Sequence, residues 1–295
     1  MLKRINWRAV FYVFAWAVCL SGLVLLMSFI ETQKTSTICK DVKVIIPGNQ
    51  NFIERAEVDA ILRINGGSLR GREIKNINIQ NLEADLKANP FIEFAKVYAD
   101  MDGVIHVQIR QREPLLRVFN MQNQDFYIDY NGYKIPTSDN FTADVLAANG
   151  YIPENFSGNV DTLKSKLVKD LFLTARYIAA DTLWSNQISQ LYVNQLNEIE
   201  MVPRVGNQKI ILGDADSLET KFRNLYFFYK KAMPKVGWET YKTINIKYAN
   251  QIVCERNIPD SSKLKKPLLK SLMADTVLRD SSIKISQDTI KINAY

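Results

Sequence analysis

Few side chains in this sequence have the types and spacing that catalysis or metal binding requires. The chain contains one histidine, His106, and three cysteines, Cys19, Cys39 and Cys254. Zinc sites and H-E-x-x-H motifs need several such ligands close together, and a catalytic cysteine needs a suitably spaced histidine. We therefore expect no metal site and no cysteine nucleophile. Cys39 and Cys254 are expected to be unrelated free thiols, with a bridge between them left open as the alternative.

The glycine-rich and acidic segments do not fit known catalytic loops either. The glycines at 66–71 are followed by Arg72-Glu73, whereas a phosphate-binding loop ends in Lys-Ser or Lys-Thr. Asp100 and Asp102 flank the tip of an expected hairpin, where solvated turn carboxylates are common. The chain also lacks a G-x-S-x-G segment. The prediction is a protein that is not an enzyme and needs no cofactor.

One long apolar segment near the N-terminus sets the topology. Residues 10–30 contain no charged side chain before Glu31 and are long enough to cross a bilayer as a helix. Basic residues in the preceding segment, 1–9, predict that this end lies in the cytoplasm and that the rest lies outside it. A cleaved signal peptide is the alternative, but the apolar segment is long for one and no small-x-small cleavage site follows. Residues 31–40 are polar and aperiodic, which indicates a stalk.

Residues 41–113 predict a small module with the order strand, helix, helix, strand, strand. The strands are expected at 42–46, 92–99 and 104–112, and the helices at 53–64 and 79–88. Two helices covering one face of a three-stranded sheet would bury the apolar positions of this pattern. His106 falls on the polar face of the last strand, so we expect it at the surface and not as a ligand.

Residues 114–257 predict a second, mixed α+β region with a largely antiparallel sheet. Asp161 is expected to cap a helix from Thr162 to Ala180, and a capping box at 216–219 is expected to open a helix ending near Met233. The aromatic run 225–229 is expected mostly in the core. Residues 141–157 are interpreted as irregular. Further strands are expected at 115–119, 126–130, 190–193, 199–202, 208–212, 243–248 and 251–256.

The last segment, 258–295, is rich in Ser, Lys and Asp, and we expect it to be mostly disordered. Alternating apolar residues at 283–292 indicate strand propensity without an evident partner. The formal net charge of +7 is modest and acidic residues are interspersed, so nucleic acid is not an expected partner.

Several segments resemble the FtsQ/DivIB family of bacterial cell-division proteins, whose first periplasmic module is a POTRA domain. The match spans about residues 2–257, with short motifs. Gln111, Asn245 and Lys247 depart from the family pattern and bear on partner contacts more than on the fold. The matching segments are Val44-Ile-Ile-Pro-Gly-Asn49, Asn89-Pro-Phe-Ile-Glu-Phe-Ala-Lys-Val97, Arg112-Glu-Pro114, Phe126-Tyr-Ile-Asp-Tyr-Asn-Gly132 and Ile244-Asn-Ile-Lys-Tyr248 through Val253.

The resemblance implies a non-enzymatic scaffold of the division complex, located at the septum in the inner membrane, with its body in the periplasm. Implied partners are FtsB- and FtsL-like single-pass proteins and the septal peptidoglycan synthase. In this family the late strands of the β domain carry the FtsB contact, together here with the face of the preceding helix. The expected partner-binding residues are Thr243, Ile244, Ile246, Tyr248, Gln251, Ile252, Val253 and Arg256.

Physical chemistry is compatible with this assignment, because an exposed edge strand can capture another chain through backbone hydrogen bonds. An edge covered by the chain's own tail is the alternative at this site. Two other classes of function are alternatives. A POTRA-containing assembly or secretion component usually has tandem modules, and no internal repeat is found here. A membrane-anchored envelope enzyme requires a nucleophile or base that the sequence does not provide.

Overall fold

The computed structural model describes residues 7–35, 37–48, 52–64, 67–248, 250–257 and 289–291 of the chain. These residues divide into two compact units, one ending at Arg112 and the other beginning at Glu113. Each unit has its own buried apolar cluster. The two units are therefore described separately.

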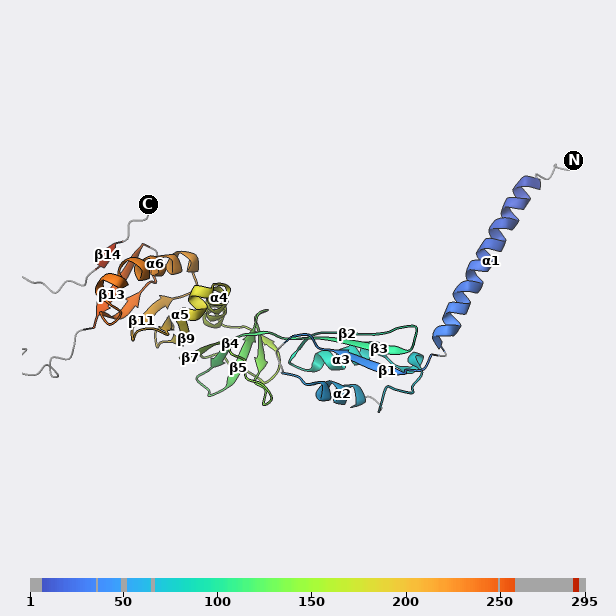
Figure 1. Cartoon of the computed structure of the whole chain (residues 1–295), viewed down its shortest axis with the longest axis horizontal. Helices are drawn as coiled ribbons and strands as arrows, with labels where there is room; N and C mark the ends of the chain where they lie inside the picture. Colours follow the sequence, from blue (N-terminus) through green and yellow to red (C-terminus); the bar gives the residue numbers. More distant parts are fainter. Residues whose placement is uncertain are drawn as a thin grey trace, which may run out of the picture. The chain divides into compact units, whose positions relative to one another are not determined.

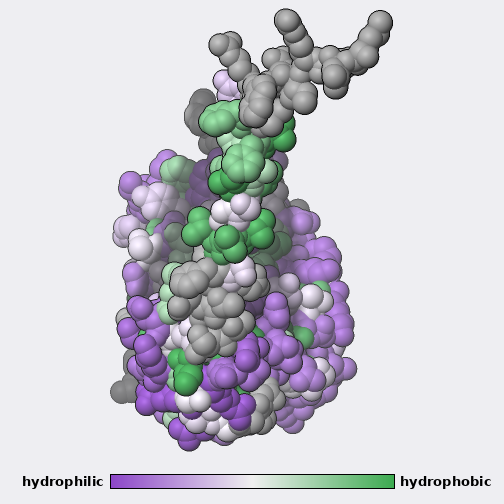
Figure 2. All heavy atoms as spheres, turned by 90° about the vertical axis from the view of Figure 1, so that its right-hand side faces the viewer, coloured by the Kyte–Doolittle hydropathy of each residue, from purple (hydrophilic) through white to green (hydrophobic). Residues whose placement is uncertain are grey.

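The first unit begins with α1 (Trp7–Thr35), in which Phe11–Ser28 is the one described segment long and apolar enough to cross a membrane. Apart from Ser21 and Ser28, its described side chains are apolar, and the exposed ones form the green column in Figure 2. The helix runs to Thr35, so the first half of the expected stalk is helical. Polar residues can extend an existing helix because each added residue gains a hydrogen bond without a new nucleation cost.

The rest of the first unit is a POTRA-like fold, in the predicted order strand, helix, helix, strand, strand. Its sheet has the order β1-β3-β2, with β1 parallel and β2 antiparallel to the central strand (Figure 1). Apolar side chains of both helices and all three strands form one cluster, as the amphipathic patterns predicted. The elements are β1 (Asp41–Ile45), α2 (Arg55–Ile64), η1 (Ile74–Asn76), α3 (Ile79–Ala88), β2 (Ile92–Ala99) and β3 (Val104–Gln111).

A short backbone network joins the segment after α1 to this fold. The N–H of Cys39 donates to the carbonyl of Arg72 at 2.7 Å, and the N–H of Ile74 donates to the carbonyl of Thr37 at 3.0 Å. Gly103, at the tip of the β2–β3 hairpin, has φ +87°, and a Cβ there would lie 2.5 Å from the carbonyl oxygen of Ile38. Glycine is required at this position because both the backbone angle and the close approach exclude a side chain.

The second unit contains a mixed sheet that confirms the predicted α+β class and its largely antiparallel character. The parallel pairs are β4–β7, β7–β9 and β11–β12. The sheet order is β14-β13-β12-β11-β10-β9-β7-β4-β5-β6-β8 (Figure 1). Its strands are β4 (Pro114–Phe119), β5 (Asp125–Asp129), β6 (Tyr133–Pro136), β7 (Leu146–Gly150), β8 (Asp161–Thr162), β9 (Ile188–Val193), β10 (Ile199–Pro203), β11 (Lys209–Gly213), β12 (Tyr241–Asn245), β13 (Gln251–Arg256) and β14 (Thr289–Lys291).

Helices α4 (Lys166–Ala180), α5 (Thr182–Gln187), α6 (Leu218–Lys231) and α7 (Met233–Val236) complete the second unit. Buried side chains of α4 and α6, including Leu171 and Phe222, belong to the same apolar cluster as the strand residues Leu191 and Ile244. This continuous cluster holds β12 and β13 to the rest of the unit.

Three local predictions were wrong. Asp161 lies in β8 instead of capping a helix, and α4 begins later, where the side chain of Ser165 accepts from the N–H of Val168. Residues 216–219 form no capping box, because the Ser217 side chain makes no cap hydrogen bond. Leu146–Gly150 is strand β7, although residues 141–157 were interpreted as irregular. Strands β7 and β8 are fixed by pairing with strands that are distant in sequence.

His106 is half-buried, with 19% of its side chain exposed. Its Nε2 lies 3.1 Å from Oδ2 of Asp100, and its ring stacks on Tyr98 with centroids 5.0 Å apart. The hydrogen bond from the N–H of Val104, and then that from His106, hold the pKa of Asp100 below its ordinary value. This arrangement orders the hairpin tip and gathers no further ligand.

Candidate partner-binding edge

The expected binding residues lie on and beside the last two strands before residue 257. Strand β12 pairs in parallel with β11 on one side and antiparallel with β13 on the other. Because β12 is enclosed between two strands, its backbone has no edge to offer. Only β13 can present backbone groups to another chain, so it defines the candidate edge.

Burial divides the expected residues into two sets. Ile244, Ile246 and Ile252 are at most 1% exposed and belong to the core cluster under α6. They can support the edge but cannot contact a partner without unfolding it. Side chains that reach the surface or lie half-buried are those of Thr243, Tyr248, Gln251, Val253 and Arg256.

Strand β14 already occupies part of this edge. It runs antiparallel to β13, with Gln251 opposite Lys291, Ile252 opposite Ile290 and Val253 opposite Thr289. Thr289–Lys291 agrees with the strand propensity expected at 283–292 and with the alternative that the chain's own tail covers this edge. The rest of the tail, which is expected to be mostly disordered, falls outside the described residues. The outer side of β13 is covered over 251–253, while no described strand pairs with 254–256 on that side.

Tyr248 lies just after β12 and is 44% exposed. Nζ of Lys247 lies 5.2 Å from the centre of its ring and donates to Oε1 of Glu198 at 2.9 Å. The hydrogen bond from Lys247 keeps the pKa of Glu198 below its ordinary value, although burial opposes this. These residues border a cavity of about 300 Å³ that also contacts Asn197 and Asp214. The ion pair between Lys247 and Glu198 orders the surface from which the ring of Tyr248 projects. We call Glu198, Lys247 and Tyr248 the Tyr248 corner.

The sequence patterns do not identify Glu198 as a residue of this site. It belongs to the turn between β9 and β10, 49 positions before Lys247, and no local pattern connects the two. Lys247 was noted only as a departure from the family motif. Charge complementarity of two isolated residues is too weak a signal to identify such a pair.

Helix α6 contributes an aromatic surface next to the edge, since it also contacts β13. Within the aromatic run, Leu225 and Phe228 are buried as predicted, whereas Tyr226 and Phe227 are 39% and 38% exposed. Lys230 and Lys231 place their amino groups 5.7 and 5.5 Å from the centres of these two rings. The outer face of α6 is therefore a cationic and aromatic surface.

The described residues around this edge contain no metal-binding group, since no cluster of three or more His, Cys, Asp or Glu is found in the described part of the chain. All three cysteines are free. Burial raises the pKa of Cys254 to about 12, so its thiol stays protonated at neutral pH and is a poor nucleophile and ligand. The arrangement suits the binding of a polypeptide strand.

Comparison with known families gives two matches. Residues 113–255 match the model described as FtsQ/DivIB, C-terminal related, and residues 37–110 match a POTRA-like domain. The first match contains the whole of β12 and nearly all of β13. The second contains the three-stranded sheet of the first unit except for the last residue of β3. No curated protein matches the chain.

Proposed function

Because this chain belongs to the FtsQ/DivIB family of non-enzymatic cell-division proteins, we propose that it is a single-pass scaffold of the bacterial division complex. In this proposal α1 spans the inner membrane with its N-terminus in the cytoplasm, and both units lie in the periplasm at the septum. The basic residues before α1 and the apolar surface of the helix support this orientation and anchorage.

We propose further that β13 and the Tyr248 corner bind an FtsB-like single-pass protein, through which FtsL-like proteins and the septal peptidoglycan synthase are recruited. The observation that carries this proposal is the pairing of β13 with β14, because this edge accepts an added antiparallel strand. Backbone pairing supplies affinity, and the exposed ring of Tyr248 supplies a side chain that a partner can recognise. The POTRA-like unit would serve targeting and contacts with other division proteins.

The test is co-purification of the full-length chain with its FtsB-like partner from envelope extracts. Tyr248→Asp places a charge where the partner is expected and should abolish recovery of the partner. Tyr133→Asp is the matched control, because Tyr133 is 38% exposed and lies on β6, far along the sheet order from β13. Full partner recovery with Tyr248→Asp would remove this site assignment. Midcell fluorescence of a tagged chain tests the septal location.

A further inference from the structure

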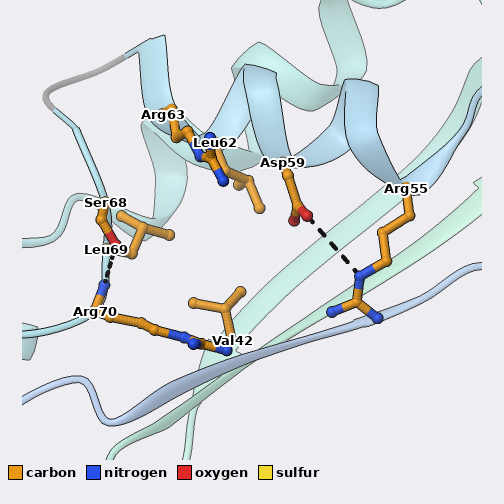
Figure 3. A pocket seen from close by; sticks show the side chains of 8 residues that line it. All are labelled: Val42, Arg55, Asp59, Leu62, Arg63, Ser68, Leu69 and Arg70. Atoms are coloured by element: carbon orange, nitrogen blue, oxygen red, sulfur yellow. Dashed lines mark hydrogen bonds and ion pairs between the residues drawn. The ribbon is translucent and has the colours of Figure 1, made fainter.

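A groove in the POTRA-like unit lies between α2 and β1, outside the proposed partner edge. It encloses about 240 Å³. Its apolar surface comes from Val42 on β1, Leu62 on α2 and Leu69 on the loop that follows α2. Figure 3 shows Leu62 and Asp59 directed from the helix toward β1, with Ser68 and Leu69 at one end of the groove. The groove is therefore a short trough with one helical wall and one strand wall.

The strand wall is an open sheet edge. Strand β1 is terminal in the order β1-β3-β2, and its inner side pairs with β3. On the outer side, residues 71–73 bond to Ile38 and Cys39, and no described strand continues this pairing along β1. The N–H of Val42 donates to Oδ1 of its neighbour Asp41 at 2.8 Å instead of to β3. The backbone of β1 beyond this point can accept another strand.

Three guanidinium groups border the groove, those of Arg55, Arg63 and Arg70. Arg55 lies 3.9 Å from the Asp59 carboxylate, and Arg70 pairs with Asp41. Both pairs are exposed, so water competes with them and they leave further N–H donors available. Arg63 is exposed and makes no ion pair with a described residue. Three guanidinium groups against the carboxylates of Asp59 and Asp41 leave the border with a net positive charge, which favours an acidic ligand.

The spacing of the arginines determines which carboxylates fit. Arg55 and Arg63 are eight positions apart on α2, which corresponds to about 12 Å along the helix axis. In an extended strand, two residues four positions apart lie on the same face and about 13 Å apart. The residue midway between them also lies on that face, where it meets the half-buried Val42 above the buried Leu62. An acid-x-apolar-x-acid strand matches the groove in charge, spacing and apolar contact.

We propose that this groove binds an extended acidic segment of another protein, which adds to β1 as a fourth strand and places carboxylates four positions apart on Arg55 and Arg63. An apolar floor and an open backbone edge favour a peptide over a lipid headgroup, which would use the arginines alone. The site is independent of the β13 edge, because it lies in the other unit. Its failure would leave the proposed scaffold function untouched.

The test uses the full chain in phosphatidylcholine nanodiscs and the fluorescent peptide Thr-Glu-Thr-Val-Thr-Glu-Thr. Binding by fluorescence anisotropy should weaken about tenfold with Arg63→Glu and with Arg55→Glu, since each removes a charge-assisted hydrogen bond. Lys96→Glu is the matched control: Lys96 is exposed on β2, at the other edge of the same sheet. It should bind the peptide as the wild type does.

A second peptide, Thr-Thr-Glu-Val-Glu-Thr-Thr, has the same charge with the acids two positions apart, and it should bind about tenfold more weakly. Hydrogen exchange should show protection of the Val42 and Val44 amides on binding the first peptide. Equal binding of the two peptides, or an equal loss with Lys96→Glu, would overturn the proposal. Arginine-dependent binding to phosphatidylglycerol vesicles with no binding of either peptide would overturn it in favour of a lipid site.

Discussion

Nζ of Lys134 donates a hydrogen bond of 3.0 Å to Oε1 of Glu154, and the two side chains are 0% and 4% exposed. Glu154 also accepts from the N–H groups of Lys164 and Ser165, each at 3.1 Å. This buried pair connects β6 to the segment leading into α4. It orders the residues just before α4, whose cap is Ser165 and not Asp161.

Replacing Lys134 with alanine should destabilise the second unit by about 3–5 kcal/mol, because it leaves the Glu154 carboxylate buried without its partner. The measurement is urea unfolding of the full chain in detergent, followed by tryptophan fluorescence. Lys164→Ala is the control, since its side chain is 70% exposed and its ion pair with Asp161 is open to water. Equal losses of unfolding free energy in the two variants would show that the buried pair stabilises the unit no more than the exposed pair does.

Glu154 also gives the stability of this unit a predicted pH dependence. Burial alone would raise its pKa, but hydrogen bonds from Lys134, Ser165 and the Lys164 N–H outweigh burial and lower the pKa below the ordinary 4.5. The folded state thus binds this proton less readily than the unfolded state does. The stabilisation is present above pH 4.5 and is lost as the pH falls through the lowered folded-state pKa.

We expect the difference in unfolding free energy between the wild type and Glu154→Gln to shrink as the solution is acidified from pH 4.5 downward. Urea unfolding at a series of pH values measures this difference. A difference that stays constant or widens on acidification would contradict the assignment.

Alanine substitutions at Gly150 and Gly158 should distinguish the cost of a steric clash from the cost of backbone strain alone. Both have positive φ, +99° and +86°, but a Cβ on Gly150 would lie 2.3 Å from the carbonyl oxygen of Val193, whereas one on Gly158 meets nothing within 4 Å. Gly158→Ala should cost about 1 kcal/mol, the ordinary penalty of a left-handed alanine. Gly150→Ala should cost clearly more, because β7 must move away from β9. Thermal unfolding of the two variants in the full chain makes the comparison.

Removal of residues 258–295 should expose the outer side of β13. The proposed FtsB-like partner should then bind about five- to tenfold more tightly, because it no longer displaces β14 and its backbone hydrogen bonds, at about 1 kcal/mol each. Hydrogen exchange at residues 251–253 of the free protein should become faster. A synthetic peptide of residues 283–295, added in trans, should reverse both effects. Unchanged exchange and unchanged affinity would show that β14 does not compete.

Local patterns were sufficient for much of the fold. The amphipathic spacing of α2 and α3 and the Asp102-Gly103 turn predicted the POTRA-like order. Leu146–Gly150 was missed because its Ala, Asn and Gly residues favour no strand, and only pairing with β4 and β9 makes it one. Tertiary contacts here override the local preference.

The candidate site was predicted in outline only. Motif resemblance identified the β12–β13 segment, but it could not separate the buried Ile252 from the exposed Tyr248 because the strand register depends on pairing partners. Glu198 was missed because its contact with Lys247 joins residues that are distant in sequence. The pairing of Ile252 with Ile290 joins positions 38 residues apart, and the alternation at 283–292 indicated a strand without indicating its partner.

The backbone bonds that follow α1 limit how far the first unit can travel. The helix ends at Thr35, and the Thr37 carbonyl accepts from the N–H of Ile74, so covalent geometry limits the distance between these two residues to about 7 Å. In the proposed topology, with α1 across the bilayer, this short connection keeps the POTRA-like unit close to the membrane surface. In that topology its encounters become a two-dimensional search, so the groove bordered by Arg55, Arg63 and Arg70 is expected to meet segments of proteins that are anchored in the same membrane.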